Sequence, residues 1–523
     1  MISKKIKTIT IKFFFLAIVG AYAFFINYYY ADLGVFPIDT FLHYDSGYRI
    51  LKNEIPIRDF WVVSGFMVDF IQALFFKIFG VNWLSYKIHS SLFNLIISIF
   101  ILQFFLNLNF GYFKSSIYTI SFATLAYTIS GTPFVDLHAS FFLLISTLTL
   151  ILALNNPEKK FFWFVSILMF CFSFLSKQVP SAYALILQVP IIISYLYLKK
   201  ANSNYKIITL SSLFIIITFL LILKFLHIDF KTFYLEYIKY PREIGAGRFD
   251  FFNISINSFF NKYKFIILPI LICIFIQTKN FFKKKNTSNS SDNLKYLLIL
   301  TLTISLLIHQ LMTKNQIFIY FLIPLLFSIL DTLLCFEFKK NKKYISIILI
   351  VLLLSITLKY HLRFNENRKF HELEDIKLSN SIEAEKIHFS LKGNLWINPT
   401  FKGAPSDEIL LIKSSVQEID NLKEEIMLIS NYLFIDSITN KNMNLPSKAF
   451  TLDGTTYPRL KNKISQDYKI FLYRQIKKKN IKKIYFLKHE NLPKKIISEF
   501  FDKECLKYYD ENFFRVYEIK CLN

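Results

Sequence analysis

Residues 11–80 join a membrane-length apolar run, IKFFFLAIVGAYAFFINYYY (11–30), to a charged and aromatic segment, PIDTFLHYDSGYRILKNEIPIRDFWVVSGFMVDFIQALFFKIFG (37–80). About 20 apolar residues are enough for a helix to cross the hydrocarbon core of a bilayer. The second segment contains acids, a histidine and arginines, which a simple connection between two spans does not need. Because ionisable groups at a membrane boundary are costly unless they are solvated or paired, we interpret this segment as part of a site.

The composition of the 523-residue chain is that of a membrane domain followed by a soluble domain. Hydrophobic residues make up 54% of the sequence, too many for a single soluble domain. We therefore predict a polytopic α-helical membrane protein, with a transmembrane domain over residues 1–360 and a small α/β domain over residues 361–523. The first span has no small-residue cleavage site, so we expect an uncleaved anchor. About eleven spans are predicted, near 11–30, 84–106, 115–130, 139–155, 160–177, 179–198, 207–227, 263–278, 295–312, 316–336 and 344–360.

The positive charge of the chain predicts an orientation rather than a nucleic-acid partner. The net charge is +25, but the lysines gather in short loops between apolar runs, with no continuous basic stripe. An excess of lysine and arginine marks cytoplasmic loops. We thus place the N-terminus inside and residues 31–83, 131–138, 228–262 and the segment after 361 outside. The lysine-rich loops lie near residues 1–12, 155–160, 199–206, 279–295 and 337–343.

Polar side chains collect on this predicted outer side, in loops that are far apart in the sequence. An acid there can act as a general base that deprotonates a hydroxyl acceptor. A basic group there can hold the phosphate of a lipid-linked donor as it departs. The combination favours glycosyl transfer, although a hydrolase could use the same groups with water as the acceptor. The outer polar residues are Asp39, His43, Asp45, Arg58, Asp59, Asp136, His138, Lys177, Gln178, Arg242, Glu243, Arg248, His309, Gln310 and Lys314.

The first loop resembles that of the GT-C glycosyltransferases, particularly the bacterial branch related to protein mannosyltransferases and lipid A aminoarabinose transferases. In that branch an acid follows the first helix, and a pattern like "a..il.G.ipyrDfw...gPl..y..a..f..fG" comes next. Here Asp39 is followed by YRILKNEIPIRDFW (48–61) and SGFMVDFIQALFFKIFG (64–80). Asn53 stands where glycine is usual, and Phe66 where proline is common. The resemblance extends weakly through residues 1–360, and a single Asp stands where an acid pair is expected.

The resemblance implies that Asp39 is the catalytic base and that Asp136 assists it. Each has a structural alternative, since Asp39 can cap a short helix and Asp136 can cap the helix predicted to begin near Ala139. Asp45 and Arg49 are spaced i,i+4, which favours a surface ion pair over catalysis.

Lys177 is the strongest candidate to bind the donor phosphate. It lies at the outer end of a span, against the positive-inside trend, although a lysine at a helix end can also snorkel to water without a function. Arg58, Arg242 and Arg248 are weaker candidates, with Asp59 orienting Arg58 or serving the structure alone. Gln178 and His43 complete the predicted substrate-binding set. His43, His138 and His309 are single residues in separate loops without metal-ligand spacing, which favours satisfied interfacial histidines over a metal site. The resemblance leaves a divalent metal ion open because some GT-C enzymes use one and others do not.

Residues 361–523 alternate β-like runs with helical stretches, which predicts a small α/β domain. The β-like runs are EIMLISN (425–431), KKIYFLKH (482–489) and FFRVYEIK (513–520). Of the five cysteines, Cys505 and Cys521 share this predicted outer domain. A disulfide between them can persist in an oxidising compartment.

We predict a membrane glycosyltransferase that moves a sugar from a polyprenyl-phosphate-linked donor to a hydroxyl group of a lipid, glycan or protein acceptor. It acts on the extracytoplasmic face of a bacterial inner (plasma) membrane, and its partners are the donor, the acceptor and membrane lipids, not nucleic acid. The alternative is a transporter or flippase of a lipid-linked saccharide, which is expected to have polar residues at mid-bilayer and internal repeats. A non-catalytic membrane scaffold is a third interpretation. The sequence has no Walker A loop, GxGxxG fingerprint or HExxH motif.

Overall fold

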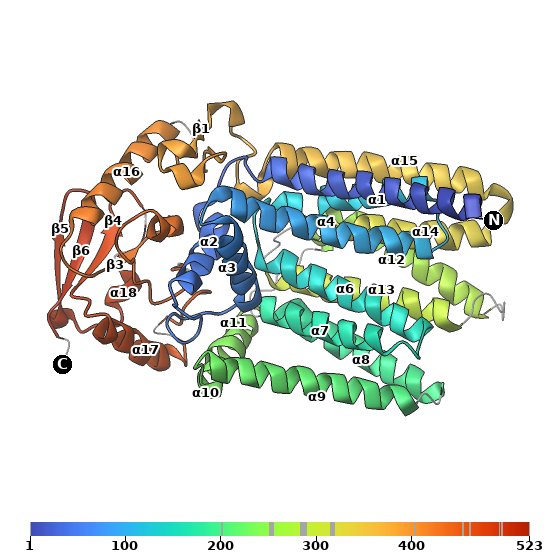
Figure 1. The fold of residues 1–523 in the computed structure, drawn as a ribbon, viewed down its shortest axis with the longest axis horizontal. Helices are drawn as coiled ribbons and strands as arrows, with labels where there is room; N and C mark the ends of the chain where they lie inside the picture. The colour runs from blue at the N-terminus through green and yellow to red at the C-terminus, as the bar shows by residue number, and fades with distance from the viewer. Residues whose placement is uncertain are drawn as a thin grey trace. The chain divides into compact units, whose positions relative to one another are not determined.

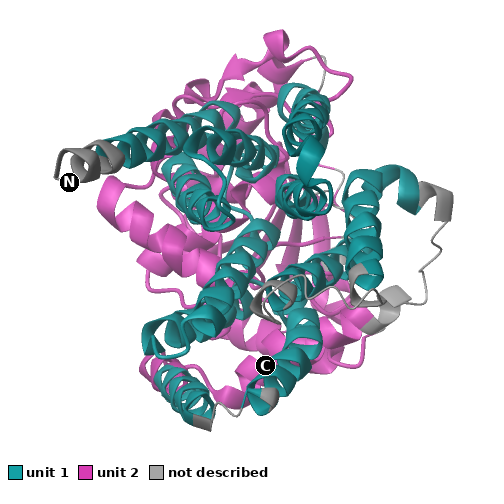
Figure 2. Cartoon of the chain, turned by 90° about the vertical axis from the view of Figure 1, so that its right-hand side faces the viewer, with its two compact units in different colours: residues 1–31, 87–218, 248–370 teal, residues 32–86, 219–247, 371–523 magenta. Residues whose placement is uncertain are grey.

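The computed structural model is mostly helical, with one four-stranded sheet in its C-terminal part (Figure 1). It divides into two compact units, each built from segments far apart in the sequence (Figure 2). Unit 1 contains residues 1–31, 87–218 and 248–370; unit 2 contains residues 32–86, 219–247 and 371–523. The structure describes residues 2–199, 202–249, 256–282, 290–313, 319–401, 404–451, 454–459, 462–490, 492 and 495–521.

Unit 1 is a helical bundle. α6 packs against α7, α8 and α13, and α1 packs against α5. The helices that lie wholly or partly in this unit are α1 (Ile2–Tyr30), α4 (Trp83–Asn107), α5 (Tyr112–Leu125), α6 (Val135–Asn155), α7 (Lys160–Ser176), α8 (Gln178–Leu198), α9 (Asn202–Phe225), α11 (Tyr240–Phe249), α12 (Ile256–Phe282), α13 (Ser290–Met312), α14 (Leu322–Glu337) and α15 (Lys342–His361).

Among the described residues, eight helices are long and apolar enough to cross a membrane, and α7 is a shorter apolar helix. The apolar helical character predicted from the sequence is therefore confirmed. The count of about eleven spans stays a prediction, because α5 and α14 have only 14 and 16 residues. The eight segments are Thr10–Tyr30, Trp83–Asn107, Val135–Asn155, Gln178–Tyr197, Ser203–Phe225, Phe259–Lys279, Leu294–Met312 and Lys339–His371.

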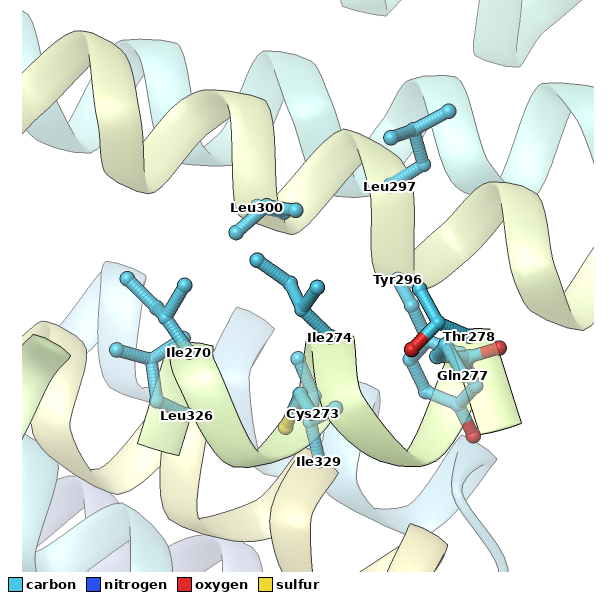
Figure 3. Close-up of a pocket in the computed structure, with 10 residues that line it drawn as sticks. All are labelled: Ile270, Cys273, Ile274, Gln277, Thr278, Tyr296, Leu297, Leu300, Leu326 and Ile329. Carbon is cyan, nitrogen blue, oxygen red and sulfur yellow. The ribbon is translucent and has the colours of Figure 1, made fainter. Parts of the chain in front are cut away.

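Several of these helices carry apolar side chains on their outer faces. α9 exposes a row of them, including Leu210, Phe214, Ile217 and Leu221. Contiguous exposed apolar surface of this kind is rare on soluble proteins and suits contact with lipid. An apolar pocket of about 410 Å³ opens between α12, α13 and α14 (Figure 3). Its few polar side chains include Gln277 and Thr278, so it offers no charged group for a reaction.

Unit 2 combines the first loop with the C-terminal part of the chain. Its sheet has the strand order β3-β4-β6-β5, with β3 and β4 parallel and the other pairs antiparallel. β3 is an apolar run, buried along its whole length, as expected for a strand covered on both faces. The α-helices and strands that lie wholly or partly in this unit, together with one π-helical turn (Leu235–Lys239), are α2 (Pro37–Leu51), α3 (Phe66–Phe79), the start of α4, the end of α9, α10 (Phe230–Tyr234), α11, β1 (Ile382–Glu383), β2 (Leu395–Trp396), α16 (Pro405–Asn421), β3 (Ile426–Ile429), α17 (Ser465–Lys478), β4 (Lys483–Leu487), α18 (Lys495–Ser498), β5 (Leu506–Asp510) and β6 (Phe514–Ile519).

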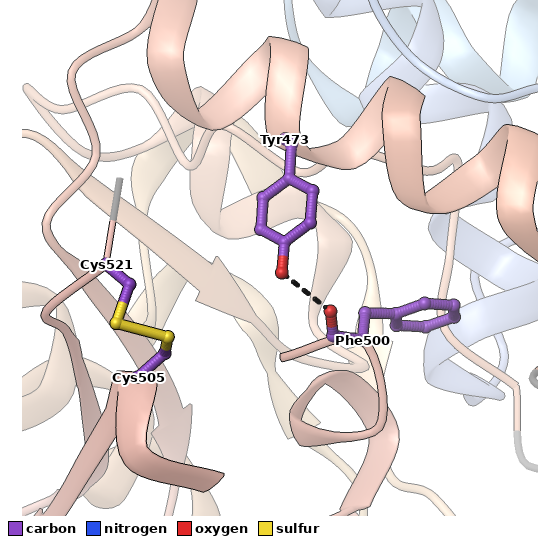
Figure 4. Close-up of a disulfide and its surroundings, with 4 residues drawn as sticks. All are labelled: Tyr473, Phe500, Cys505 and Cys521. Atoms are coloured by element: carbon purple, nitrogen blue, oxygen red, sulfur yellow. Dashed lines mark hydrogen bonds between the residues drawn. A yellow bond between two sulfur atoms is a disulfide. The ribbon is translucent and has the colours of Figure 1, made fainter. Parts of the chain in front are cut away.

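The α/β character predicted for the C-terminal part is confirmed at the level of its strands and helices. Cys505 and Cys521 form the predicted disulfide, which joins residues beside the two antiparallel strands β5 and β6 (Figure 4). Nearby, the Tyr473 hydroxyl of α17 donates to the Phe500 carbonyl at 2.8 Å. Residues 361–523 as a domain of their own remain a prediction, because the compact unit also includes the first loop.

The first loop is attached to the C-terminal part of unit 2 by backbone and ionic contacts. The Trp61 amide donates to the Pro446 carbonyl at 2.9 Å, and the Lys448 amide donates to the Trp61 carbonyl at 3.0 Å. The Arg49 guanidinium donates to the Leu445 carbonyl at 2.8 Å. Residues 58–61 of the first loop, which we call the RDFW motif, are thus part of a packed core, where Trp61 is 1% exposed.

A buried ion pair lies beside these contacts. The Lys448 ammonium is 2.8 and 2.6 Å from the two carboxylate oxygens of Asp69 on α3, and it also donates to the Ser64 carbonyl at 3.2 Å. His43 Nδ1 lies 2.6 Å from Asp69 Oδ1. All three side chains are buried, which raises the pKa of Asp69 to about 7 against the opposing effect of Lys448, and lowers the pKa values of His43 and Lys448.

Above pH 7, where Asp69 is ionised, we expect Lys448→Met to destabilise the protein strongly, because it leaves the Asp69 carboxylate buried without a cation. Removing one partner of a buried pair typically costs about 3–5 kcal/mol. The double variant Lys448→Met/Asp69→Asn should be less destabilised than Lys448→Met alone. Thermal unfolding of the detergent-solubilised protein measures both effects, with the exposed Lys488→Met as the control. A Lys448→Met protein that unfolds at the wild-type temperature would contradict the structure.

The raised pKa of Asp69 also predicts a pH dependence. The folded carboxyl keeps its proton between pH 3.8 and about 7, where the unfolded carboxyl has lost it. Its contribution to the free energy of unfolding is therefore full below pH 3.8 and is lost as the pH rises toward 7. Measured against the Lys448→Met/Asp69→Asn variant, wild-type stability should fall across this window. A difference that stays constant or grows with pH would show that Asp69 does not titrate in this way.

Candidate functional site

The predicted site residues Asp136 and Lys177 lie together in unit 1, with His309 as a third member. α6 begins beside Asp136, α7 ends and α8 begins at Lys177, and His309 lies in the last turn of α13. These helices pack against one another. The three side chains therefore share one end of the bundle, whereas the loop between α6 and α7 and Lys199 after α8 lie at the other end.

The position of Asp136 follows from the start of α6. The helix begins at Val135 after Phe134, whose backbone is extended, and Asp136 lies in the first turn. The predicted capping role near Ala139 is therefore wrong, because the helix starts four residues earlier. A carboxylate in the first turn still interacts favourably with the positive end of the helix dipole.

The position of Lys177 follows from the break between α7 and α8. Lys177 has extended backbone angles (φ −154°, ψ 134°), and Val179 after it is also non-helical. Pro180 disfavours a helical conformation for the residue before it, so the chain turns here instead of continuing α7. The Ser173 hydroxyl donates to the Ala139 carbonyl at 2.7 Å and lies 2.6 Å from the Ser181 hydroxyl, which joins α6, α7 and α8 next to the break.

The contacts within this cluster are close. The Lys177 ammonium lies 2.8 and 2.9 Å from the two oxygens of Asp136, and His309 Nε2 lies 2.5 Å from Asp136 Oδ1. His309 is fully buried and the Asp136 side chain is 2% exposed, whereas the Lys177 side chain is 18% exposed. Among the described residues, Asp136 is the one hydrogen-bond partner of the lysine ammonium. One N–H group of Lys177 thus stays available for an anion.

A second pair of buried histidines borders the cluster. His138 follows Asp136 by two residues on α6. Its Nε2 atom lies 3.0 Å from His89 Nε2, and its Nδ1 atom lies 2.5 Å from the Tyr127 hydroxyl. The Phe134 amide donates to the same hydroxyl at 2.9 Å. These contacts fix the start of α6, and therefore the direction in which Asp136 points.

Asp39, the predicted base, belongs to unit 2. It lies in the first turn of α2, which begins at Pro37 after Phe36, and its side chain is half-buried. Phe36 occupies the cap position, so the capping alternative for Asp39 is wrong as well. Its catalytic role stays a prediction.

The other candidates of the first loop have partners within unit 2. Arg58 donates to Asp59 Oδ2 at 2.9 and 2.6 Å and to the carbonyls of Asn53 and Leu226. Asp59 also accepts from the Ile55 amide and from Lys478, both at 2.9 Å. These bonds and the charge of Arg58 lower the pKa of Asp59 although its burial opposes this. His43 is fully buried against Asp69.

Asp45 differs from the expectation of a surface ion pair. Its nearest cation is Arg49 at 3.9 Å, but both side chains are buried, and Arg49 makes its closer contact with Glu54 at 2.7 Å. Neither carboxylate oxygen of Asp45 has a hydrogen-bond partner among the described residues. Burial raises the pKa of Asp45 despite the nearby Arg49. A sequence spacing of i,i+4 predicts proximity, but it does not say which side of the helix faces water.

The remaining candidates are one residue beside the cluster, one exposed residue, and two whose side chains lie outside the described part of the chain. Gln178 begins α8 directly after Lys177 and is half-buried. Arg242 lies exposed on α11. The Arg248 side chain and Lys314 lie outside the described residues. No group of three or more metal-ligating side chains is found in the described part of the chain.

The sequence places His309 among the outer polar residues and predicts an isolated interfacial histidine. The structure makes it a partner of Asp136 across 173 positions of sequence. The available signal was its place at the predicted outer end of a span. No protein-family model and no curated protein matches this chain.

We expect the Asp136–Lys177 pair to be energetically coupled. Lys177→Met leaves a buried carboxylate without its cation, whereas Lys177→Met in an Asp136→Asn background does not. Double-mutant cycles on such contacts give coupling energies of roughly 0.5–3 kcal/mol. Thermal unfolding of the wild type, the two single variants and the double variant measures this coupling. Lys199→Met at the other end of α8 provides the matched control. Additive effects of Asp136→Asn and Lys177→Met would argue against the contact.

Proposed function

We propose that this protein is a membrane glycosyltransferase that uses a polyprenyl-phosphate-linked sugar and a hydroxyl acceptor. The Asp136–Lys177–His309 cluster is the observation that carries the proposal. It brings together two residues chosen independently from the sequence, an assisting acid and a phosphate-binding lysine. It also lies at the end of the bundle opposite to the lysine-rich loop near residues 155–160, which corresponds to the outer face if that loop is cytoplasmic.

In the proposed reaction the acceptor oxygen forms a bond to the anomeric carbon of the sugar while the bond from that carbon to the phosphate oxygen breaks. The acceptor proton passes to a carboxylate, and polyprenyl phosphate leaves with the bonding electron pair. Lys177 donates its remaining N–H to the departing phosphate, and a positioned cation stabilises the charge that develops there. Asp136 holds the ammonium in place, since a lysine side chain is otherwise flexible, and His309 in turn holds Asp136.

Asp39 is the proposed base, on the sequence resemblance, with Asp136 assisting. A base needs an ionised carboxylate that is within reach of the acceptor hydroxyl. Asp136 is engaged by a lysine and a histidine, which favours its role in orienting Lys177 over proton abstraction. Asp45, on the same helix as Asp39, is the other first-loop acid to compare, because its oxygens lack hydrogen bonds among the described residues.

A flippase for a lipid-linked saccharide is the competing function. It shares the need for a phosphate-binding lysine, so Lys177 alone does not separate the two. Sugar transfer requires a base and forms a new glycosidic bond. Flipping needs no base and leaves the lipid-linked saccharide chemically unchanged. Product formation by the purified protein in detergent, where no bilayer separates two faces, therefore discriminates between the functions.

We expect Lys177→Met to abolish sugar transfer while the protein is still inserted in the membrane, because the departing phosphate loses its cation. Cells that lack the chromosomal copy are complemented with each variant, and their envelope glycans and lipid-linked saccharides are compared by mass spectrometry. Lys199→Met removes the same charge from the other end of α8 and should retain the wild-type glycan profile. An unchanged profile in the Lys177→Met strain would exclude the proposed role of this lysine.

We expect Asp39→Asn to abolish the modification with wild-type expression and insertion, because the amide cannot accept the proton of the acceptor. The exposed Asp375→Asn in the same unit is the control. Loss of activity in Asp45→Asn with retention in Asp39→Asn would move the base to Asp45. Activity in both variants would remove the first-loop acids from the mechanism.

A further inference from the structure

Two basic segments, one from the first loop and one from the C-terminal part, meet on the surface of unit 2. Residues 52–59 form a turn after α2, and residues 474–483 include the last turn of α17 and the start of β4. The Gln475 side chain donates to the Arg58 carbonyl at 3.4 Å, and the Lys478 ammonium lies 2.9 Å from Asp59. The Lys479 ammonium binds Glu54. The turn and the helix end therefore form one surface.

Positive charge exceeds negative charge in the two segments that form this surface. The two segments contain eight lysines and arginines and two acids. Both acids are already shared, since Glu54 binds Arg49 and Lys479, and Asp59 binds Arg58 and Lys478. Four exposed cations have no ion pair with a described acid, and we call them the basic ridge: Lys52, Arg474, Lys477 and Lys482.

The stability of the fold does not explain the basic ridge. Arg474 and Lys477 are spaced i,i+3 on α17, and Arg474 and Lys478 are spaced i,i+4, so like charges are neighbours on the helix surface and repel one another. The one compensating effect is the favourable position of cations at a helix C-terminus, which applies to α17 and to Lys52 at the C-cap of α2 but not to Lys482. A bound polyanion would relieve this repulsion.

We propose that the basic ridge binds an anionic glycan, a polysaccharide with repeated phosphate or carboxylate groups. Spaced cations match spaced anions, and binding releases counterions. The Tyr48 ring, half-buried and 5.5 Å from the Lys52 ammonium, offers an apolar face against which a sugar ring can pack. This binding is separate from the proposed transfer reaction and is tested without it.

The ridge fits a hydrated polymer better than a bilayer surface. Interfacial binding to lipid combines basic residues with large apolar side chains that enter the membrane. Within residues 52–59 and 474–483, none of the described residues is an exposed large apolar side chain. Ile470, one turn before Arg474 on α17, is the nearest one along the sequence.

Binding is measured with the purified full-length protein in non-ionic detergent. The probes are dextran phosphate, polygalacturonate and neutral dextran of similar length, together with vesicles of phosphatidylglycerol or phosphatidylcholine. The test variant is Arg474→Gln/Lys477→Gln/Lys482→Gln. The matched control, Lys377→Gln/Lys413→Gln/Lys507→Gln, removes the same charge from exposed positions elsewhere in unit 2.

We expect both charged polymers, but not neutral dextran, to bind the wild type and the control. The ridge variant should bind at least about ten-fold more weakly, and the slope of log K against log salt should fall by about two to three. Unchanged unfolding temperatures would show that the substitutions leave the fold intact. Equal loss in the control and the ridge variant would overturn the proposal. Ridge-dependent binding to phosphatidylglycerol vesicles without binding to the polymers would overturn it in favour of a membrane surface.

Discussion

A buried carboxylate that keeps its charge has to be paired, and this constraint shapes both units of the protein. Each unit contains an aspartate that is contacted on both oxygens by a lysine and on Oδ1 by a histidine. In unit 1 the aspartate is Asp136, and in unit 2 it is Asp69. An unpaired buried charge costs several kcal/mol. In each unit, the pairing therefore holds together the segments that carry the aspartate, the lysine and the histidine, although these segments are far apart in the sequence.

In unit 2 this constraint joins segments that are almost the whole chain apart. Asp69 and Lys448 are 379 positions apart, and the same contact region includes the strand-like pairing of Trp61 with Ser447. The RDFW motif, chosen from the sequence as part of a site, is the centre of this region. The Arg49 guanidinium lies 3.9 Å from the centre of the Phe60 ring, and Asp59 accepts from both a neighbouring backbone amide and Lys478. The contacts of these motif residues thus serve packing.

The sequence was sufficient for the features that depend on local composition. Apolar runs of membrane length, the strands Ile426–Ile429 and Lys483–Leu487, and the shared predicted side of Asp136 and Lys177 all follow from periodicity and charge. It was insufficient where the answer depends on contacts between distant segments. Nothing in the spacing of the first loop indicates that Lys448 pairs with Asp69, or that Asp45 is buried. The helix starts were also misplaced, because Phe134 and Phe36 occupy cap positions without the usual polar side chain.

The two aspartate–lysine–histidine clusters differ in one respect that separates a structural role from a functional one. The Lys448 side chain is 5% exposed, and its ammonium has the Asp69 oxygens, the Ser64 carbonyl and His43 as neighbours. Its hydrogen-bonding capacity is used within the fold. The Lys177 side chain is 18% exposed and is bonded to Asp136 alone among the described residues. A lysine held in position by a carboxylate, with one donor not used by a described residue, is suited to bind an anion that arrives and departs. That remaining donor is the reason to seek the chemistry at Lys177 rather than at the better-buried cluster.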